Sequence, residues 1–191
     1  MGEIKDASEI LANVLSEKAT ITLIVAKNQK NIIGVGKTMA WTKKEVRGEQ
    51  TYFKYVTQDS AVIMGRSSYE DIPIEHREMP GRQMIILTTN REYKPFSENH
   101  SIANSFEEAI HIAKLKNAKN IFIAGGGKVY EQAIKEKTFD TALITEVDIN
   151  IASPEVITFF PQLSKKDFLV EELKGIKGEN WELFRWTRIT N

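Results

Sequence analysis

Cysteine is absent from this 191-residue sequence, and it contains only 5 prolines. Without cysteine the protein has no disulfide, no thiolate zinc site and no cysteine nucleophile, so any catalysis must use other groups. No internal repeat, low-complexity tract or Pro/Gly/Ser-rich linker divides the sequence. One domain is therefore expected, and a domain of this length buries roughly 70% of its unfolded surface.

A surplus of charge of one sign is also missing, because 26 Lys and Arg residues balance 26 Asp and Glu residues. Binding to nucleic acid or to an anionic membrane normally needs excess Lys and Arg, so neither partner is expected. No stretch approaches the ~20 apolar residues of a membrane span. The charged N-terminus lacks the apolar stretch of a signal peptide, which favours a cytoplasmic protein.

The apolar pattern along the chain predicts alternating strands and helices. The strand segments are nearly continuous in apolar character, as in strands covered on both faces. Ser105 and Glu108 form a capping box at the start of one helix. This alternation is typical of crossover units in a mainly parallel sheet. Strands are expected at 19–26, 61–64, 84–88, 120–124 and 141–145, and helices at 44–56, 105–116 and 128–137.

The two ends of the chain follow other patterns. Apolar residues recur at helical spacing over residues 6–18, which predicts an amphipathic helix outside the main domain. Residues 168–173 and 181–189 alternate as half-buried strands around a GIKGEN turn. This C-terminal hairpin is expected to close the sheet as an antiparallel edge.

Two glycine-rich segments are candidates for phosphate binding. The segment from Gly34 to Thr38 ends like a P-loop, but Asn31 stands where the full motif needs glycine, which favours a surface loop. Gly125–Gly127 follow a predicted strand and begin a predicted helix, where backbone amides can hold a phosphate. The alternative is a tight turn with close helix packing. Tyr130 stands where a Rossmann fingerprint has its third glycine, which disfavours that fold.

One acidic residue is the main candidate for catalysis. Glu45, Glu49 and Phe53 are spaced four residues apart, so on a helix they share a face. In an apolar pocket Glu49 could accept paired hydrogen bonds from an amidine-like ligand; otherwise it is an ordinary solvated carboxylate. The three histidines have no metal-site spacing, so no metal is expected and we expect surface positions for His76, His100 and His111.

Taken together, seven segments in order resemble dihydrofolate reductase, from about residue 20 to the C-terminus. The resemblance implies an α/β fold with a central, mainly parallel, eight-stranded sheet, an antiparallel C-terminal hairpin edge and helices on both faces. Residues 1–18 are then an N-terminal helical extension and 19–191 the dihydrofolate reductase domain. The segments are ITLIVAKNQKNIIG, MAW, EQTYFKYVT, VIMGRSSYEDIP, PGRQMIILT, IAGGGKVYEQAI and LITEVD, followed by FFP.

The resemblance implies NADPH-dependent reduction of 7,8-dihydrofolate to tetrahydrofolate, by hydride transfer to C6 and protonation of N5. Glu49 matches the carboxylate that binds the pterin, Thr145 a buried threonine that supports it by hydrogen bonding, and Trp41 a residue of the loop over the nicotinamide. Arg82 matches the arginine that binds the glutamate α-carboxylate of folate. The implied substrate-binding residues are Ile24, Val25, Glu49, Phe53, Ile72, Arg82, Ala124 and Thr145.

NADPH is the implied cofactor. Arg66 matches a residue that neutralises its 2′-phosphate, and the hydroxyl residues after it match a pyrophosphate site at a helix start. Gly125 and Gly126 match a pair joined in this family by a cis peptide. The implied cofactor-binding residues are Ala26, Ile33, Gly34, Gly65, Arg66, Ser67, Ser68, Leu87, Thr88, Thr89, Ala124, Gly126, Gly127, Lys128, Val129 and Tyr130.

Some residues depart from the family pattern. The interval from Trp41 to Glu49 is longer than the family leads us to expect, which predicts an inserted turn and leaves Glu45 as a lesser alternative acid. Ala40, Ala124, Met84 and Tyr69 also differ from the usual residues. Two other functions stay open: a pyrimidine reductase of riboflavin synthesis with the same fold, and a noncatalytic nucleotide-binding module. Dihydrofolate and antifolate-type small molecules are the expected ligands, and a monomer is expected with a homodimer as the alternative.

Overall fold

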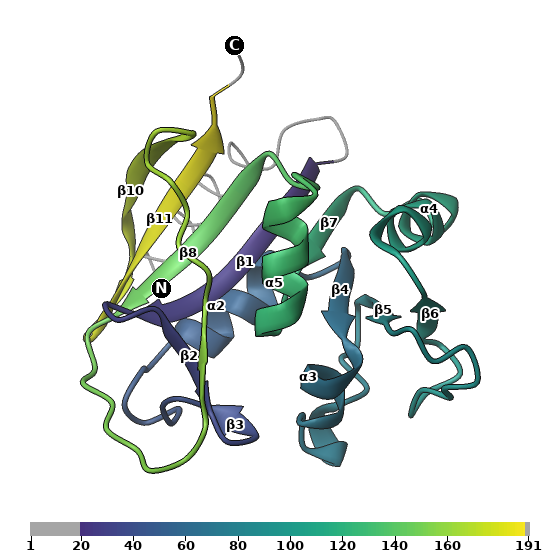
Figure 1. The fold of residues 1–191 in the computed structure, drawn as a ribbon, viewed down its shortest axis with the longest axis horizontal. Helices are drawn as coiled ribbons and strands as arrows, with labels where there is room; N and C mark the ends of the chain where they lie inside the picture. Colours follow the sequence, from purple (N-terminus) through teal and green to yellow (C-terminus); the bar gives the residue numbers. More distant parts are fainter. Residues whose placement is uncertain (1–19, 190–191) are drawn as a thin grey trace.

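The computed structural model describes residues 20–189. The helix predicted at 6–18 lies outside these residues. At the centre is an eight-stranded sheet in the order β10-β11-β8-β1-β7-β4-β5-β6 (Figure 1). Its strands are β1 (Thr20–Asn28), β4 (Ala61–Gly65), β5 (Gln83–Leu87), β6 (Ser101–Ala103), β7 (Asn120–Ile123), β8 (Thr141–Val147), β10 (Phe168–Gly178) and β11 (Trp181–Arg188).

The direction of the strands confirms the predicted topology. All pairings from β8 through β1, β7, β4 and β5 to β6 are parallel. The C-terminal strand β11 pairs antiparallel with both β8 and β10, so the hairpin forms the expected antiparallel edge. A small second sheet was not predicted; it contains β3 (Thr38–Met39), β2 (Ile32–Val35) and β9 (Ile157–Phe159), which are too short to give a clear pattern.

Helices cover both faces of the sheet, as predicted. Figure 1 shows α5 (Gly127–Lys135) in front of β1 and α2 (Glu49–Val56) behind it. The apolar side chains of α4 (Phe106–Leu115) and α5 share one core cluster with Leu23 and Ile63. On the other face α2 packs with Ile24 and Leu143, and α3 (Arg66–Glu70) adds Tyr69 to a third cluster. Within residues 20–189, no helix is both long and apolar enough to cross a lipid bilayer.

Three predictions about local structure are wrong. The helix predicted at 44–56 begins at Glu49, because Gly48 has a left-handed backbone (φ 87°) and the residues before it form turns. The GIKGEN segment is mostly strand, since β10 runs to Gly178 through a register irregularity and leaves only residues 179–180 as the turn. His100 is buried, where its ring nitrogen Nδ1 lies 2.9 Å from the Tyr69 hydroxyl.

The segment resembling a P-loop is a turn between two strands. Gly36 has a left-handed backbone (φ 59°), and Thr38 continues directly into β3. The next helix along the chain starts only at Glu49, so this segment does not lead directly into a helix as a P-loop does. The structure therefore supports the surface-loop interpretation.

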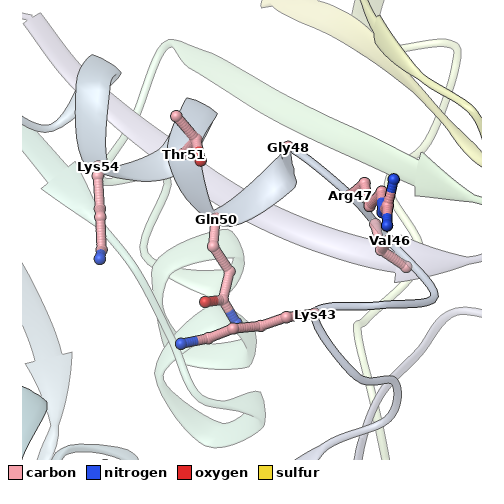
Figure 2. A pocket seen from close by; sticks show the side chains of 7 residues that line it. All are labelled: Lys43, Val46, Arg47, Gly48, Gln50, Thr51 and Lys54. Carbon is pink, nitrogen blue, oxygen red and sulfur yellow. The ribbon is translucent and has the colours of Figure 1, made fainter.

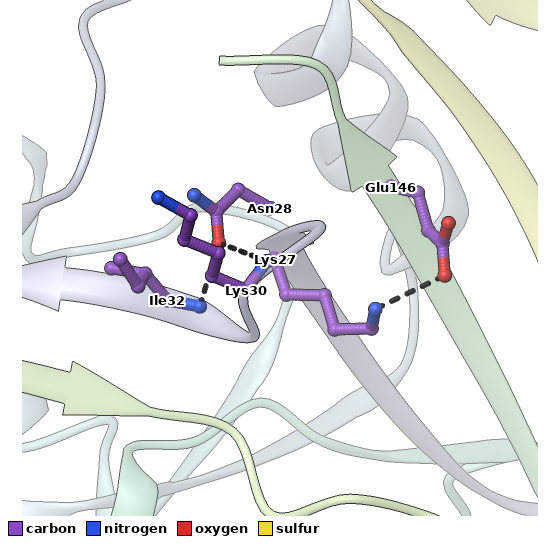
Figure 3. A network of polar contacts seen from close by, with 5 residues as sticks. All are labelled: Lys27, Asn28, Lys30, Ile32 and Glu146. Atoms are coloured by element: carbon purple, nitrogen blue, oxygen red, sulfur yellow. Dashed lines mark hydrogen bonds and ion pairs between the residues drawn. The ribbon is translucent and has the colours of Figure 1, made fainter. Parts of the chain in front are cut away.

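Asn28 fixes the turn that leads from β1 into β2 and so places Ile33 and Gly34 (Figure 3). Its side-chain oxygen accepts hydrogen bonds from the backbone N–H groups of Lys30 and Ile32, at 3.0 and 2.9 Å. Its amide nitrogen donates to the carbonyl of Ile149 at 3.1 Å. Next to it, Lys27 crosses to Glu146 on β8 with an Nζ–Oε1 distance of 3.0 Å (Figure 3).

Replacing Asn28 with Ala is expected to lower the free energy of unfolding by about 2–4 kcal/mol, because buried backbone groups lose their partners. Chemical denaturation at pH 7 measures this loss. The neighbouring Gln29→Ala removes an exposed amide and serves as the control, with an expected change of at most about 0.5 kcal/mol. Equal effects of the two substitutions are incompatible with this role for Asn28.

Candidate active site

Several predicted site residues lie at the edge of the sheet where the parallel strands end, whereas Arg82 directly precedes β5, at the opposite end of that strand. This edge is where open α/β sheets bind ligands. Ala26 lies near the end of β1, Gly65 ends β4, Thr88 follows β5 and Ala124 follows β7. Ala124 is partly buried between the clusters formed by α2 and α3.

Glu49 is the first residue of α2 and is buried, with 8% of its surface exposed. It lies on the same helix face as Tyr52 and Val56, which pack into the core beneath the helix. Desolvation raises the pKa of the Glu49 carboxyl to about 7. The solvated alternative for this residue is therefore wrong, and a buried carboxyl that changes protonation near neutral pH is what acid–base chemistry needs.

Two buried tyrosines lie near this carboxyl. Burial raises the pKa values of the Tyr52 and Tyr130 hydroxyls, and the negative charge of Glu49 raises both further. Tyr130 donates a hydrogen bond to the carbonyl of Ile24 at 2.7 Å, which ties α5 to β1. These contacts bring Ile24, Glu49 and Tyr130 to one place from three distant segments of the chain.

The C-terminal hairpin holds the turns before α2. Asn180 donates to the carbonyl of Glu45 at 3.0 Å, and the Trp181 indole N–H donates to the carbonyl of Arg47 at 2.7 Å. The Trp181 ring also packs on Tyr52, with ring centroids 6.0 Å apart. Residues far along the chain thus fix the point at which α2 begins, and with it the position of Glu49.

Glu45 does not share the site. It lies in the turns before α2, is exposed, and its carboxylate accepts hydrogen bonds from the backbone N–H and the hydroxyl of Thr42, at 2.8 and 2.7 Å. These hydrogen bonds to Thr42 lower the pKa of the Glu45 carboxyl. The prediction that Glu45 and Glu49 share a helix face is wrong, because the helix does not include residue 45.

Arg82 lies beside the C-terminal end of α2. Its guanidinium donates to the Thr57 hydroxyl at 2.8 Å and to the carbonyls of Lys54 and Pro80, at 2.6 and 3.0 Å. Partial burial lowers the pKa of the Arg82 guanidinium, partly offset by Asp59. These three hydrogen bonds hold the guanidinium plane in one orientation.

The turn at residues 65–68 and the turn at residues 125–127, both implied to bind phosphates of NADPH, contact each other. The backbone N–H of Gly65 donates to the carbonyl of Gly125 at 2.7 Å, and the Gly125–Gly126 peptide is cis, as expected. Neither turn has room for a Cβ: one on Gly126 would lie 2.3 Å from the Ser68 hydroxyl oxygen, and one on Gly65 2.7 Å from Val129. Glycine at these positions lets the starts of α3 and α5 approach each other closely.

Arg66 and Thr88 lie at the outer part of this region. Arg66 is exposed, stacks 5.7 Å from the Tyr93 ring centroid and lies 3.5 Å from the Glu70 carboxylate. The Thr88 hydroxyl accepts a hydrogen bond from the backbone N–H of Asn90 at 3.2 Å. Ser67, Thr89 and Lys128 are exposed nearby in sequence, and Ser68 and Leu87 are half-buried.

The remaining predicted residues line the interior. Ile24, Val25, Ala26, Ile33 and Val129 are buried. Trp41 and Phe53 are half-buried against the cluster under α2, and Ile72 against the cluster under α3; Gly34 and Gly127 are also half-buried. Thr145 is buried opposite Ala26 in β8, but no direct hydrogen bond joins its hydroxyl to Glu49 in the described structure.

Sequence reasoning missed Tyr52 and the hairpin contacts. Tyr52 is three residues after Glu49, so the helical spacing already placed both on one face. The contacts from Asn180 and Trp181 carried no such signal, because they join residues more than a hundred positions apart. Within residues 20–189, no group of three or more His, Asp or Glu side chains is arranged to hold a metal ion.

Comparison with known proteins gives a consistent result. The family profile described as dihydrofolate reductase matches residues 20–188. A dihydrofolate reductase of Candida albicans is 35% identical over 150 residues, which cover 73% of either chain. A bifunctional dihydrofolate reductase-thymidylate synthase of Daucus carota is 31% identical over 182 residues, and the match covers 85% of this chain but only 33% of that protein.

A solved structure shows the same fold. It is the dihydrofolate reductase from Enterococcus faecalis complexed with NADP(H) and RAB-propyl, with a TM-score of 0.72 and 22% sequence identity. The match covers 90% of this chain and 97% of that one. Together with the buried acid at the start of α2 and the paired glycine turns, the match over residues 20–188 shows that this chain belongs to the dihydrofolate reductase family.

Proposed function

We propose that this protein catalyses the NADPH-dependent reduction of 7,8-dihydrofolate to 5,6,7,8-tetrahydrofolate. The observation that carries the proposal is Glu49, a buried carboxyl at the start of α2 whose pKa is raised to about 7 by desolvation. Membership of the family and the NADP(H) complex of the Enterococcus faecalis enzyme support the choice of substrate and cofactor.

Glu49 is proposed to bind the pterin ring and promote protonation of N5. A carboxylate can accept two parallel hydrogen bonds, which matches the 2-amino group and N3–H of a pterin. At neutral pH the Glu49 carboxyl exchanges a proton readily, because its pKa lies near 7. Thr145 is proposed to support Glu49; since no direct bond joins them, this support would pass through a water molecule or the bound pterin.

Arg82 is proposed to bind the glutamate α-carboxylate of dihydrofolate. Its three hydrogen bonds to Thr57, Lys54 and Pro80 fix the guanidinium before the substrate arrives. The aminobenzoyl part of the substrate is proposed to lie between Phe53 of α2 and Ile72 after α3, which are half-buried and apolar. Ile24, Val25 and Ala124 are proposed to complete this apolar surface near the pterin ring.

The residues at the glycine turns fit NADPH. The helix α5 starts at Gly127 without a side-chain cap, so its first backbone N–H groups are free to bind a pyrophosphate. Ser67, Ser68, Thr88, Thr89 and Lys128 are proposed to add donors around the phosphates. The nicotinamide supplies the hydride when NADPH is bound.

Other residues of this chain are proposed to orient that ring and exclude water. The Tyr130 hydroxyl and the Ile24 carbonyl it binds lie at the same place as Glu49. Ala26, Ile33, Gly34, Leu87 and Gly126, with Gly65, Gly127 and Val129, form the walls of the proposed cofactor site. Trp41 is proposed to close over the reacting rings from the loop before α2.

The two alternatives make different predictions. A pyrimidine reductase of riboflavin synthesis needs no acid at Glu49 and no carboxylate-binding Arg82. A noncatalytic nucleotide-binding module gives no turnover. The decrease of absorbance at 340 nm in a mixture of the protein, NADPH and dihydrofolate therefore tests the proposal. Steady oxidation of NADPH is expected, and no oxidation by purified, folded protein overturns the proposal.

Arg66 provides a test of cofactor recognition. Arg66→Ala is expected to weaken NADPH binding about 10- to 100-fold, because charge-assisted hydrogen bonds to the 2′-phosphate are lost, and to leave NADH binding nearly unchanged. Fluorescence titration with both dinucleotides measures the ratio. Lys165→Ala, which removes an exposed cation from the segment between β9 and β10, is the control. If Arg66→Ala weakens both dinucleotides equally, Arg66 does not read the 2′-phosphate.

A further inference from the structure

The guanidinium of Arg66 already has a counter-charge within the protein. Its Nη1 atom lies 3.5 Å from Oε1 of Glu70, one helical turn further along α3. The two side chains are 43% and 41% exposed, so a ligand from solution can reach both. Arg66 is proposed to bind the 2′-phosphate of NADPH, whereas Glu70 belongs to neither the proposed pterin site nor the proposed cofactor site.

Tyr93 lies beside this ion pair. The central carbon of the Arg66 guanidinium lies 5.7 Å from the centroid of the Tyr93 ring. Burial raises the pKa of the Tyr93 hydroxyl, and the negative charge of the Glu70 carboxylate raises it further, so that carboxylate also lies close to the ring. The cation, the acid and the aromatic ring therefore form one cluster.

The cluster joins α3 to the loop after β5. The Tyr93 ring packs on the apolar residues that β4, β5 and α3 share, which include Tyr69. Short-range hydrogen bonds fold the loop: the backbone N–H of Asn90 donates to the Thr88 hydroxyl at 3.2 Å, and the backbone N–H of Tyr93 donates to the carbonyl of Asn90 at 3.3 Å. Because Thr88 belongs to the proposed NADPH site, Tyr93 holds Arg66 against a loop of that site.

The charges of the cluster affect the two common nicotinamide dinucleotides differently. A guanidinium paired with a carboxylate gives up that contact when it forms bidentate hydrogen bonds with a phosphate. A phosphate ester carries a charge of about −1.5 to −2 at neutral pH, so Glu70 also repels it. NADH has a neutral 2′-hydroxyl at the same position, and the pair of Arg66 with Glu70 can stay intact when NADH binds.

We propose that Glu70 sets the preference of this protein for NADPH over NADH, by competing with the 2′-phosphate for Arg66. The inference rests on the proposed function, and in particular on the assignment of Arg66 to the 2′-phosphate. Glu70 lowers the affinity for NADPH and leaves the affinity for NADH unchanged. The preference for NADPH is therefore smaller than Arg66 alone would give.

The test measures the dissociation constants of NADPH and NADH by fluorescence titration. Glu70→Gln removes the competing charge and keeps the size of the side chain. This variant is expected to bind NADPH about 3- to 10-fold more tightly, because an exposed ion pair and an exposed repulsion each contribute a modest factor. The dissociation constant of NADH is expected to stay the same. The gain for NADPH is expected to shrink at high salt, where exposed charges are screened.

A double-mutant cycle shows whether Glu70 acts through Arg66. In the Arg66→Ala background, Glu70→Gln is expected to change the affinity for NADPH by less than about twofold, since no guanidinium remains to be released. A gain of equal size with and without Arg66 rules out competition for the guanidinium. Arg66→Ala protein that binds NADPH as tightly as the native protein also overturns the inference.

Glu171→Gln is the matched control. Glu171 is an exposed acid paired with Arg185, and it lies on the edge strand β10, four strands away from the β4 strand that precedes α3. Both dissociation constants are expected to be native in this control. The inference is wrong if Glu70→Gln leaves the affinity for NADPH unchanged, if the control gives an equal gain, or if Glu70→Gln alters NADPH and NADH binding equally.

The proposed reaction is judged separately, because the titrations contain no dihydrofolate. Native protein that binds NADPH but does not oxidise it with dihydrofolate contradicts the proposed reaction, and the titrations still decide the role of Glu70. Native protein that binds neither dinucleotide contradicts both the proposed cofactor and the role of Glu70.

Discussion

Glu49→Gln is expected to lower kcat for dihydrofolate reduction at pH 7 by about 10²- to 10³-fold, the range of a lost acid–base group. The amide keeps the size of the side chain but cannot exchange a proton with the substrate. Glu45→Gln is the matched control, because Glu45 is an exposed acid four residues earlier that binds only Thr42. Full activity is expected for this control, and a comparable loss in both variants is inconsistent with the assignment.

The pH profile gives a second view of the same residue. The reaction consumes a proton, and Glu49 holds one below its pKa of about 7. For the native protein kcat/KM is therefore expected to fall about tenfold per pH unit above pH 7, once the Glu49 carboxyl is ionised. Glu49→Gln is expected to lack this slope. A profile that is flat from pH 6 to 9 in the native protein contradicts the role of Glu49.

Burial of Glu49 also has a consequence for stability. Its pKa is about 7 in the folded protein and about 4.5 when unfolded, so between these values the folded state binds the extra proton. Native stability therefore falls as the pH rises from about 4.5 to 7, by a total of about 3 kcal/mol. Urea denaturation of native protein and Glu49→Gln at pH 5 and pH 8 measures this difference. If the difference in free energy of unfolding between the native protein and Glu49→Gln is the same at both pH values, the raised pKa of Glu49 is contradicted.

Gly125→Ala is expected to have the second large effect. Gly125 has a left-handed backbone (φ 103°), and a Cβ there would lie 2.9 Å from the Tyr130 ring. Tyr130 is held by its hydrogen bond to Ile24, so it cannot move away without breaking a contact of the site. Strain and overpacking together are expected to cost about 2–4 kcal/mol of stability and to weaken NADPH binding more than tenfold.

Gly175→Ala separates the effect of backbone strain from the effect of overpacking. Gly175 has a similar backbone (φ 96°) but is exposed on β10, away from the proposed sites. Its substitution is expected to cost only the strain, about 1–2 kcal/mol, with no effect on NADPH binding. Calorimetry and dinucleotide titration of both variants check this. NADPH affinity unchanged in Gly125→Ala contradicts the close packing of Tyr130 on this turn.

The parts of the fold that could be predicted are those with local signals. Buried parallel strands such as β4 and β7 are short apolar runs, and the Ser105 cap marks the start of α4; its side chain accepts a hydrogen bond from the backbone N–H of Glu108 at 3.1 Å. The start of α2 was predicted too early because the turns before it have helix-forming residues. Their conformation is set by Asn180 and Trp181, which lie too far along the chain for any local pattern to include.

For the candidate site, spacing identified Glu49 and its helix face but could not show its burial. Burial depends on tertiary packing around α2, such as that of the Trp181 ring on Tyr52, which no local pattern includes. His100 was misplaced for the same reason, since a lone histidine in a polar segment gave no sign of its buried contact with Tyr69. The cavity on the outer side of α2, lined by Lys43, Arg47 and Lys54 among others (Figure 2), could not be predicted from the sequence, because these residues come from a loop and a helix that only the fold brings together.

The most direct test of the central claim follows the transferred hydrogen. The native protein is incubated with dihydrofolate and NADPH carrying deuterium at the transferable C4 position, and the product is analysed by mass spectrometry and NMR. The account predicts tetrahydrofolate with one deuterium at C6, formed at a rate that Glu49→Gln reduces about 10²- to 10³-fold. Recovery of unreacted dihydrofolate, or tetrahydrofolate without deuterium at C6, contradicts it.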